Sequence, residues 1–160
     1  MDFEQRLQKA IERGQQRGEA QSREAAAKAL THDEQRRMHS QYRLQLSEHI
    51  DVCFKKLANF LPGFQLETIF GERGWGAAVN RDALRLERGQ RERDFSRLEI
   101  SVRPIGTMMI LEIVSKGTVR NREVLVRNYF EPVTEVEIAK FVEQIDRWIL
   151  EFAEAYAADG

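Results

Sequence analysis

Residues 97–114 have the sequence RLEISVRPIGTMMILEIV, whose hydrophobic pattern changes half-way. In its first part, apolar and polar side chains alternate, as in a strand with one face in a core and the other in water. After a break at Pro104, residues 108–114 are apolar at every position but Glu112, which predicts a central strand buried on both faces. The break is too short for a parallel crossover, so the two strands are expected to be antiparallel.

Similar patterns extend this sheet in both directions along the chain. Alternation over residues 64–70 predicts a strand that leads into a glycine-rich turn at 71–76, and residues 83–87 fit a second strand or a short helical turn. Residues 88–94 have only polar side chains and a glycine, so a loop is expected there. With a last strand near 124–129, the prediction is an antiparallel meander of four or five strands between residues 64 and 130.

Two amphipathic helices flank this sheet in the sequence. Residues 31–61 place an apolar side chain every three or four positions, after a possible capping box at Thr31–Glu34 and before Pro62-Gly63. Residues 134–157 repeat the pattern after a second possible capping box. The predicted fold is therefore α+β, with one domain over residues 31–160.

Residues 1–30 are expected to form a helical arm or a flexible extension. Phe3, Leu7 and Ile11 make one short apolar stripe, but Ala20 is the only apolar side chain between Glu12 and Glu24. Such a segment cannot build a core of its own. We therefore expect the arm to dock on another surface, which can belong to the same chain, a second copy or a different protein.

The composition of the 160 residues narrows the class of protein. A charged fraction of 32% and a mean hydropathy of -0.54 are typical of a globular domain in water. No apolar run is long enough to cross a membrane, and the N-terminus lacks the pattern of a signal peptide. Cys53 is the only cysteine, which excludes an internal disulfide and suits a reducing compartment, so a cytoplasmic location is expected.

The sequence contains no recognisable catalytic, cofactor-binding or metal-binding set. His49 and Cys53 are four residues apart, a spacing that can bring two ligands to one metal, but no further ligands accompany them. As a nucleophile and base, this pair would lack an orienting group and an oxyanion hole. Gly71, Gly74 and Gly76 have the wrong order for a phosphate-binding loop. We therefore expect a protein without enzymatic activity, cofactor or metal.

Nucleic-acid binding is an alternative, because the chain is unevenly charged. The formal charge is +3 over residues 62–130 and -6 over residues 131–160. Phe95 or Tyr129 could stack on bases while arginines contact phosphates. Five acidic residues between positions 81 and 103 would oppose that contact. The candidate phosphate ligands are Arg81, Arg85, Arg97 and Arg103.

Association with another protein is the function that these patterns favour. A sheet with both helices on one face leaves its other face uncovered, and exposed apolar surface normally marks an interface. We expect an adaptor or chaperone-like interaction module, dimeric, that binds through the sheet face or the arm. An arm that folds back over the sheet would remove this need, and a small-molecule pocket between sheet and helices is a further alternative. The candidate interaction residues are Phe3, Leu7, Ile11, Arg73, Trp75, Arg97 and Arg103.

Overall fold

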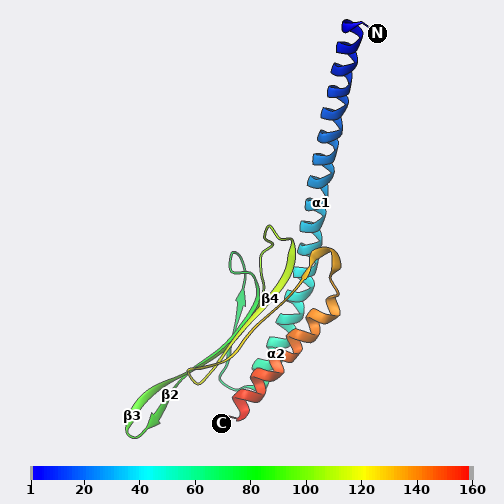
Figure 1. The fold of residues 1–160 in the computed structure, drawn as a ribbon. Coiled ribbons are helices and arrows are strands. Elements are labelled where there is room, and N and C mark those ends of the chain that lie inside the picture. Colours follow the sequence, from blue (N-terminus) through cyan, green and yellow to red (C-terminus); the bar gives the residue numbers. More distant parts are fainter. Residues whose placement is uncertain (1, 159–160) are drawn as a thin grey trace. The chain divides into compact units, whose positions relative to one another are not determined.

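The computed structural model describes residues 2–158, apart from the side chains of residues 28–30, 85 and 87. The predicted α+β class is confirmed (Figure 1). The chain divides into two units, Met1–Arg37 and Met38–Gly160. In chain order, the elements are α1 (Phe3–Phe60), β1 (Gln65–Ile69), β2 (Trp75–Glu87), β3 (Gln90–Val102), β4 (Ile110–Val119), β5 (Arg122–Pro132), a 3₁₀ turn (Val133–Glu135) and α2 (Ile138–Ala158).

The second unit is an antiparallel sheet covered by helices. Its five strands lie side by side in the order of the sequence, which confirms the predicted meander. Residues 38–60 of α1 and all of α2 pack on one face of this sheet (Figure 1). The core between the two layers contains large apolar side chains that are fully buried: Leu46, Ile50, Phe54, Leu98, Ile100, Leu111, Ile113, Phe141, Ile145 and Phe152.

Strand β4 buries only one of its faces. Leu111 and Ile113 point into the core, whereas Ile110 and Val114 on the other face are half-buried. Met108 precedes the strand and is 79% exposed. The prediction of a strand buried on both sides is therefore wrong, and the central strand of the sheet is β3. The physical reason is that, among the described residues, the helices form one layer only.

A long β-hairpin replaces the predicted loop at residues 88–94. β2 and β3 pair from Trp75↔Val102 to Glu87↔Gln90. Arg88 and Gly89 both have positive φ, 53° and 76°, as a two-residue hairpin turn requires. β4 pairs with β3 only over Arg97–Val102, so the hairpin extends beyond the other strands (Figure 1). Residues 88–93, which form the described part of its tip, are all exposed, and their sequence therefore has no reason to alternate between apolar and polar side chains.

The first unit is α-helical from Phe3 onwards. α1 continues without interruption through residue 31, so the predicted helix start at Thr31 is wrong. The Thr31 hydroxyl does not cap a helix, because it donates a 3.0 Å hydrogen bond to the carbonyl oxygen of Ala27 one turn earlier. No side chain described between residues 2 and 34 is buried.

The second predicted capping box is also absent. A 3₁₀ turn occupies Val133–Glu135, and α2 begins at Ile138. The backbone N–H of Glu137 instead donates a 2.7 Å hydrogen bond to Oε1 of Glu131 at the end of β5. A carboxylate from the preceding strand therefore supplies the acceptor at this helix start. Within the described residues, neither helix is both long enough and apolar enough to traverse a bilayer.

Candidate functional site

The arm presents its apolar stripe to solvent. Phe3, Leu7 and Ile11 are 74%, 49% and 54% exposed. Their spacing of four residues places them on one helix face, and Gly14 and Gly18 continue that face at steps of three and four. The structure therefore places the three predicted residues on one helix face. Two positions further along this face, Gly14 and Gly18, have no side chain.

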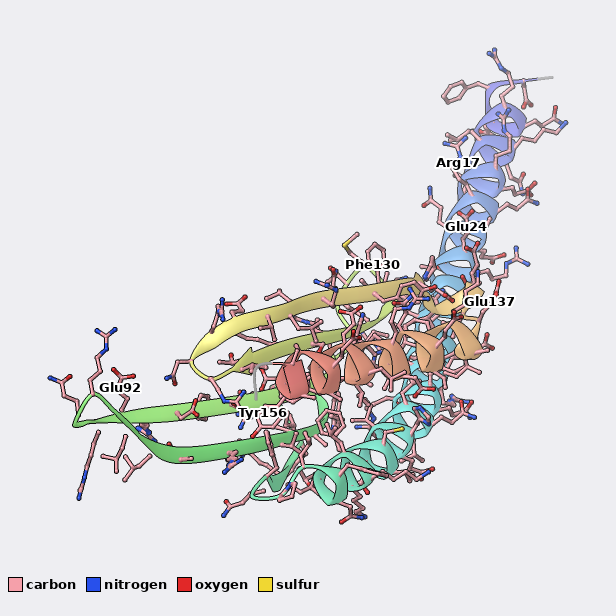
Figure 2. All side chains as sticks on the ribbon, turned by 90° about the horizontal axis from the view of Figure 1, so that it is seen from below. Arg17, Glu24, Glu92, Phe130, Glu137 and Tyr156 are labelled. Atoms are coloured by element: carbon pink, nitrogen blue, oxygen red, sulfur yellow. The ribbon has the colours of Figure 1, made fainter. Side chains whose placement is uncertain are left out.

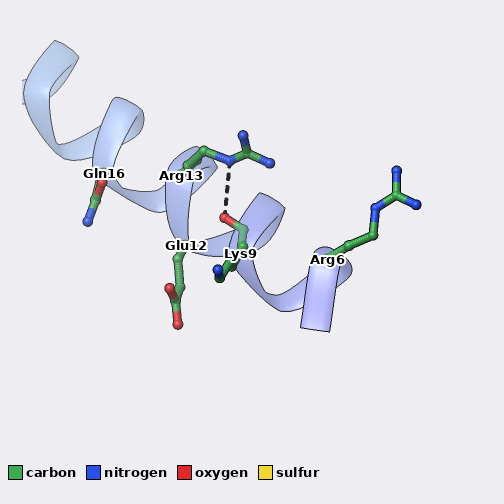
Figure 3. A pocket seen from close by; sticks show the side chains of 5 residues that line it. All are labelled: Arg6, Lys9, Glu12, Arg13 and Gln16. Atoms are coloured by element: carbon green, nitrogen blue, oxygen red, sulfur yellow. Dashed lines mark hydrogen bonds between the residues drawn. The ribbon is translucent and has the colours of Figure 1, made fainter. Parts of the chain in front are cut away.

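A group of polar and charged residues lies on the other side of the helix. Figure 3 shows five long polar side chains that spread apart from one another around a shallow hollow. Arg13 Nε donates a 3.4 Å hydrogen bond to the carbonyl oxygen of Lys9. This face is typical of a helix side in water, in contrast to the apolar stripe. The five residues are Arg6, Lys9, Glu12, Arg13 and Gln16.

Trp75 belongs to the packed side of the sheet. It is the first residue of β2, pairs with the core residue Val102, and is half-buried. The Arg43 guanidinium lies over its ring, 4.1 Å from the centroid to Cζ. Arg73, two residues earlier, is exposed and approaches Glu99 at 3.7 Å. The structure therefore separates these two candidates, since Trp75 joins β2 to α1 and Arg73 stays at the surface.

Arg97 is the centre of an ion-pair network on the uncovered sheet face. Its guanidinium contacts Glu67 at 2.9 Å and Glu99 at 3.3 Å. The hydrogen bond from Arg97 lowers the pKa of Glu67 below its ordinary value. Arg103 approaches Glu112 at 3.6 Å. Carboxylates of the same sheet, from β1, β3 and β4, therefore pair with both arginines.

Two further arginines of the long hairpin have partners of their own: the candidate Arg81, and Arg93, which was not a candidate. Arg81 points to the helix side, where it donates a 2.8 Å hydrogen bond to the hydroxyl of Tyr156. Arg93 donates to Asp82 at 2.8 Å along the hairpin. The side chain of Arg85 lies outside the described residues. The interleaved acids seen in the sequence thus act as ion-pair partners of several arginines.

An apolar patch lies at the β4–β5 side of the uncovered face. Val126 and Phe130 are 58% and 53% exposed. Both are diagonal neighbours of Val114, which pairs with Asn128 between them. Figure 2 shows Phe130 on the side of β5 away from α2. We call Ile110, Val114, Val126 and Phe130 the β4–β5 patch.

A side-chain cluster that the sequence did not predict joins α1 to α2. Asp146 Oδ1 lies 2.8 Å from Nε2 of His49 and 3.8 Å from Sγ of Cys53. The same His49 nitrogen is 3.5 Å from the Cys53 sulfur. Sequence reasoning identified the histidine and the cysteine but could not add Asp146, which is 93 residues away from Cys53. The side chains of His49 and Asp146 are 29% and 49% exposed.

This cluster does not have the geometry of a nucleophilic triad. In such a triad the imidazole uses one nitrogen for the nucleophile and the other for the carboxylate. Here a single nitrogen of His49 faces both Cys53 and Asp146. Burial, and next the charge of Asp146, raise the pKa of the Cys53 thiol, which disfavours the reactive thiolate.

Beside the cluster, α1 and α2 form an apolar groove. Cys53 and Asp146 lie at its polar edge, and its other lining residues are Lys56, Leu57, Phe60, Ile149, Leu150 and Ala153.

Comparisons with models of protein families, with curated proteins and with solved structures give no match to this chain.

Proposed function

We propose that this protein is a non-enzymatic interaction module of the cytoplasm, adaptor or chaperone-like, which forms a homodimer through the arm of α1. The observation that carries the proposal is the exposed stripe of Phe3, Leu7 and Ile11. Apolar side chains at one side of a helix normally face a partner surface, because their burial contributes roughly 25 cal/mol per Å².

Two glycines in the arm support a partner helix. A glycine in a helix interior costs roughly 0.5–1 kcal/mol relative to alanine. Apart from the adjacent backbone of the helix itself, a Cβ built at Gly14 or at Gly18 would meet nothing within 4 Å, so packing within the chain does not explain either glycine. Neither has a positive φ. Close approach of a second helix would explain both, since they lie on the face of Phe3, Leu7 and Ile11.

A second copy is the occupant that this face suits best. The face runs from Phe3 to Ala25 through Gly14, Gly18 and Ser22, and bears no charge along that line. Identical helices carry identical stripes, so the same patch can serve both partners of a two-fold dimer. The β4–β5 patch then remains available for a different protein.

Light scattering on the full chain tests this proposal. The expected mass is twice the chain mass of 18.7 kDa. Leu7→Glu combined with Ile11→Glu should give a monomer, because two carboxylates would be buried without partners. Gln5→Glu combined with Gln16→Glu is the matched control, which adds two carboxylates on the opposite face of the same helix without removing a charge. The control should remain dimeric.

Two results would contradict dimerisation through the arm. One is a monomer at every protein concentration. The other is a dimer that survives the Leu7 and Ile11 substitutions but is lost on Phe130→Glu, which would assign the interface to the β4–β5 patch.

Nucleic-acid binding remains the alternative function. The pairing of Arg97 and Arg103 with carboxylates favours protein binding instead, because paired guanidinium groups must leave their partners before they contact phosphates. A gel shift at low salt with mixed RNA and DNA tests this alternative. Binding that is lost on Arg97→Glu combined with Arg103→Glu would support it, and no binding at low salt would exclude it.

A further inference from the structure

We propose that His49, Cys53 and Asp146 bind one divalent cation of the zinc class, which links α1 to α2. The three donors differ in chemistry: an imidazole nitrogen, a sulfur and a carboxylate oxygen. Zn²⁺ takes all three as ligands, and thiolate with imidazole selects it over Mg²⁺ or Ca²⁺, which prefer oxygen.

The spacing of the donor atoms fits a tetrahedral ion. Ligands bound at about 2.0–2.3 Å around a tetrahedral centre lie about 3.3–3.6 Å apart. The observed separations are 2.8 Å for nitrogen to oxygen, 3.5 Å for nitrogen to sulfur and 3.8 Å for sulfur to oxygen. Only small side-chain shifts are needed to place all three atoms around one ion.

The backbone holds two of the donors in this arrangement. His49 and Cys53 are one helical turn apart on α1, so their side chains leave the helix on the same side. Ile50, next to His49, and Ile145, next to Asp146, are both fully buried in the core between α1, α2 and the sheet. The packed core therefore sets the distance between the two helices at the cluster.

The fourth coordination position would be open. Three protein ligands leave room for a water molecule or another donor. Cys53 and Asp146 also line the apolar groove that continues towards Leu150 and Ala153. An ion at this place would thus lie at the edge of a hydrophobic groove.

Cobalt and zinc titrations of the untagged full chain test the site. Co²⁺ should bind one ion per chain and produce a thiolate-to-metal charge-transfer band together with the visible bands of a tetrahedral complex. Zn²⁺ should displace it, and a large excess of Mg²⁺ should not. Absence of the charge-transfer band at saturating Co²⁺ would overturn the proposal.

Single substitutions assign the ligands. Cys53→Ser should remove the charge-transfer band, and His49→Gln or Asp146→Asn should weaken binding tenfold or more. Asp51→Asn is the matched control on α1, since Asp51 pairs with Lys55 and lies outside the cluster. It should bind Co²⁺ like the unmodified chain. Unchanged Co²⁺ affinity in His49→Gln or Asp146→Asn, or equal losses in the control, would contradict the assignment.

A measurement on the unmodified chain tests the metal site even if the variants fail to fold. Cys53 is the only cysteine, so thiol alkylation reports on this position alone. Zn²⁺ should slow the alkylation at least tenfold under native conditions, and a chelator should restore the original rate. An alkylation rate that does not change with Zn²⁺ would overturn the proposal.

Discussion

The guanidinium of Arg43 in α1 lies over the ring of Trp75 at the start of β2, with Cζ 4.1 Å from the ring centroid. The sequence suggested Trp75 for surface contact, but this pair makes it part of the joint between helix and sheet. A cation over an aromatic face contributes about 0.5–1 kcal/mol at a partly exposed site.

Substitution of either Arg43 or Trp75 should lower the free energy of unfolding. Arg43→Met should reduce the free energy of unfolding by about 0.5–1 kcal/mol, since it keeps the apolar stem but removes the charge. Trp75→Ala should cost about 2–3 kcal/mol, less than the roughly 3–5 kcal/mol of a fully buried aromatic residue. Urea unfolding of both variants and of the double variant measures the coupling. Additive losses would show that the two side chains do not interact.

Gly76 is expected to tolerate no side chain. A Cβ at this position would lie 2.0 Å from the carbonyl oxygen of Ile100 and 2.7 Å from Cα of Ser101. Both are backbone atoms, so no rotamer change relieves the clash. Gly76→Ala should therefore destabilise the protein by at least about 2 kcal/mol in urea unfolding. Gly106→Ala is the control, because a Cβ there would meet nothing within 4 Å.

His39 should make the protein less stable in acid. It is 3% exposed, and burial, followed by the charge of Arg43, lowers its pKa although a hydrogen bond to the Arg103 backbone raises it. The unfolded chain therefore takes up a proton below about pH 6.5, where folded His39 is still neutral.

The resulting loss of stability begins as the pH falls through about 6.5 and ends below the lowered pKa of the folded state, with a limiting slope of about 1.4 kcal/mol per pH unit. Urea unfolding between pH 7.5 and pH 5, with a chelator present, measures it. His39→Gln should flatten the dependence, whereas His32→Gln, at an exposed position, should leave it unchanged. Equal pH profiles for His39→Gln and the unmodified chain would contradict this cause.

Tyr129 should resist ionisation in base. Its hydroxyl donates a hydrogen bond to Glu131, and the hydrogen bond raises the pKa of Tyr129 to about 12. Because the folded state keeps the phenol neutral, this contribution to stability is full below about pH 10 and is lost between pH 10 and about 12. NMR or ultraviolet titration should resolve the raised pKa, and Glu131→Gln should bring it back towards the ordinary value. A Tyr129 that titrates near pH 10 in the unmodified chain would be inconsistent with this hydrogen bond.

Substitution of the arm glycines should change helix content and dimer stability in opposite directions. Gly14→Ala combined with Gly18→Ala should increase helix content, since each alanine favours the helix by roughly 0.5–1 kcal/mol. If these positions face a second copy, the added methyl groups should weaken the dimer. Circular dichroism and light scattering on the same sample measure both effects. A dimer that becomes tighter would contradict close approach at the glycines.

Local patterns predicted the fold class well where one face of an element is buried. The alternation at Leu98, Ile100 and Val102 and the helical spacing around Phe141 and Ile145 both reflect a side chain that must reach the core. The hairpin tip at Arg88-Gly89 has no such constraint, and a polar stretch there looks the same whether it is paired or not. The capping pattern at Thr31 was misleading for a similar reason, since the same four residues also fit the interior of a helix.

The amino-acid sequence alone determined that this chain forms an antiparallel meander with amphipathic helices, because periodicity depends on near neighbours only. The tertiary structure decided which side of β4 meets the helices, and it brought Asp146 to His49 and Cys53. Those relations depend on how two helices pack over one face of a sheet. Contacts between residues almost a hundred positions apart leave no mark in local spacing.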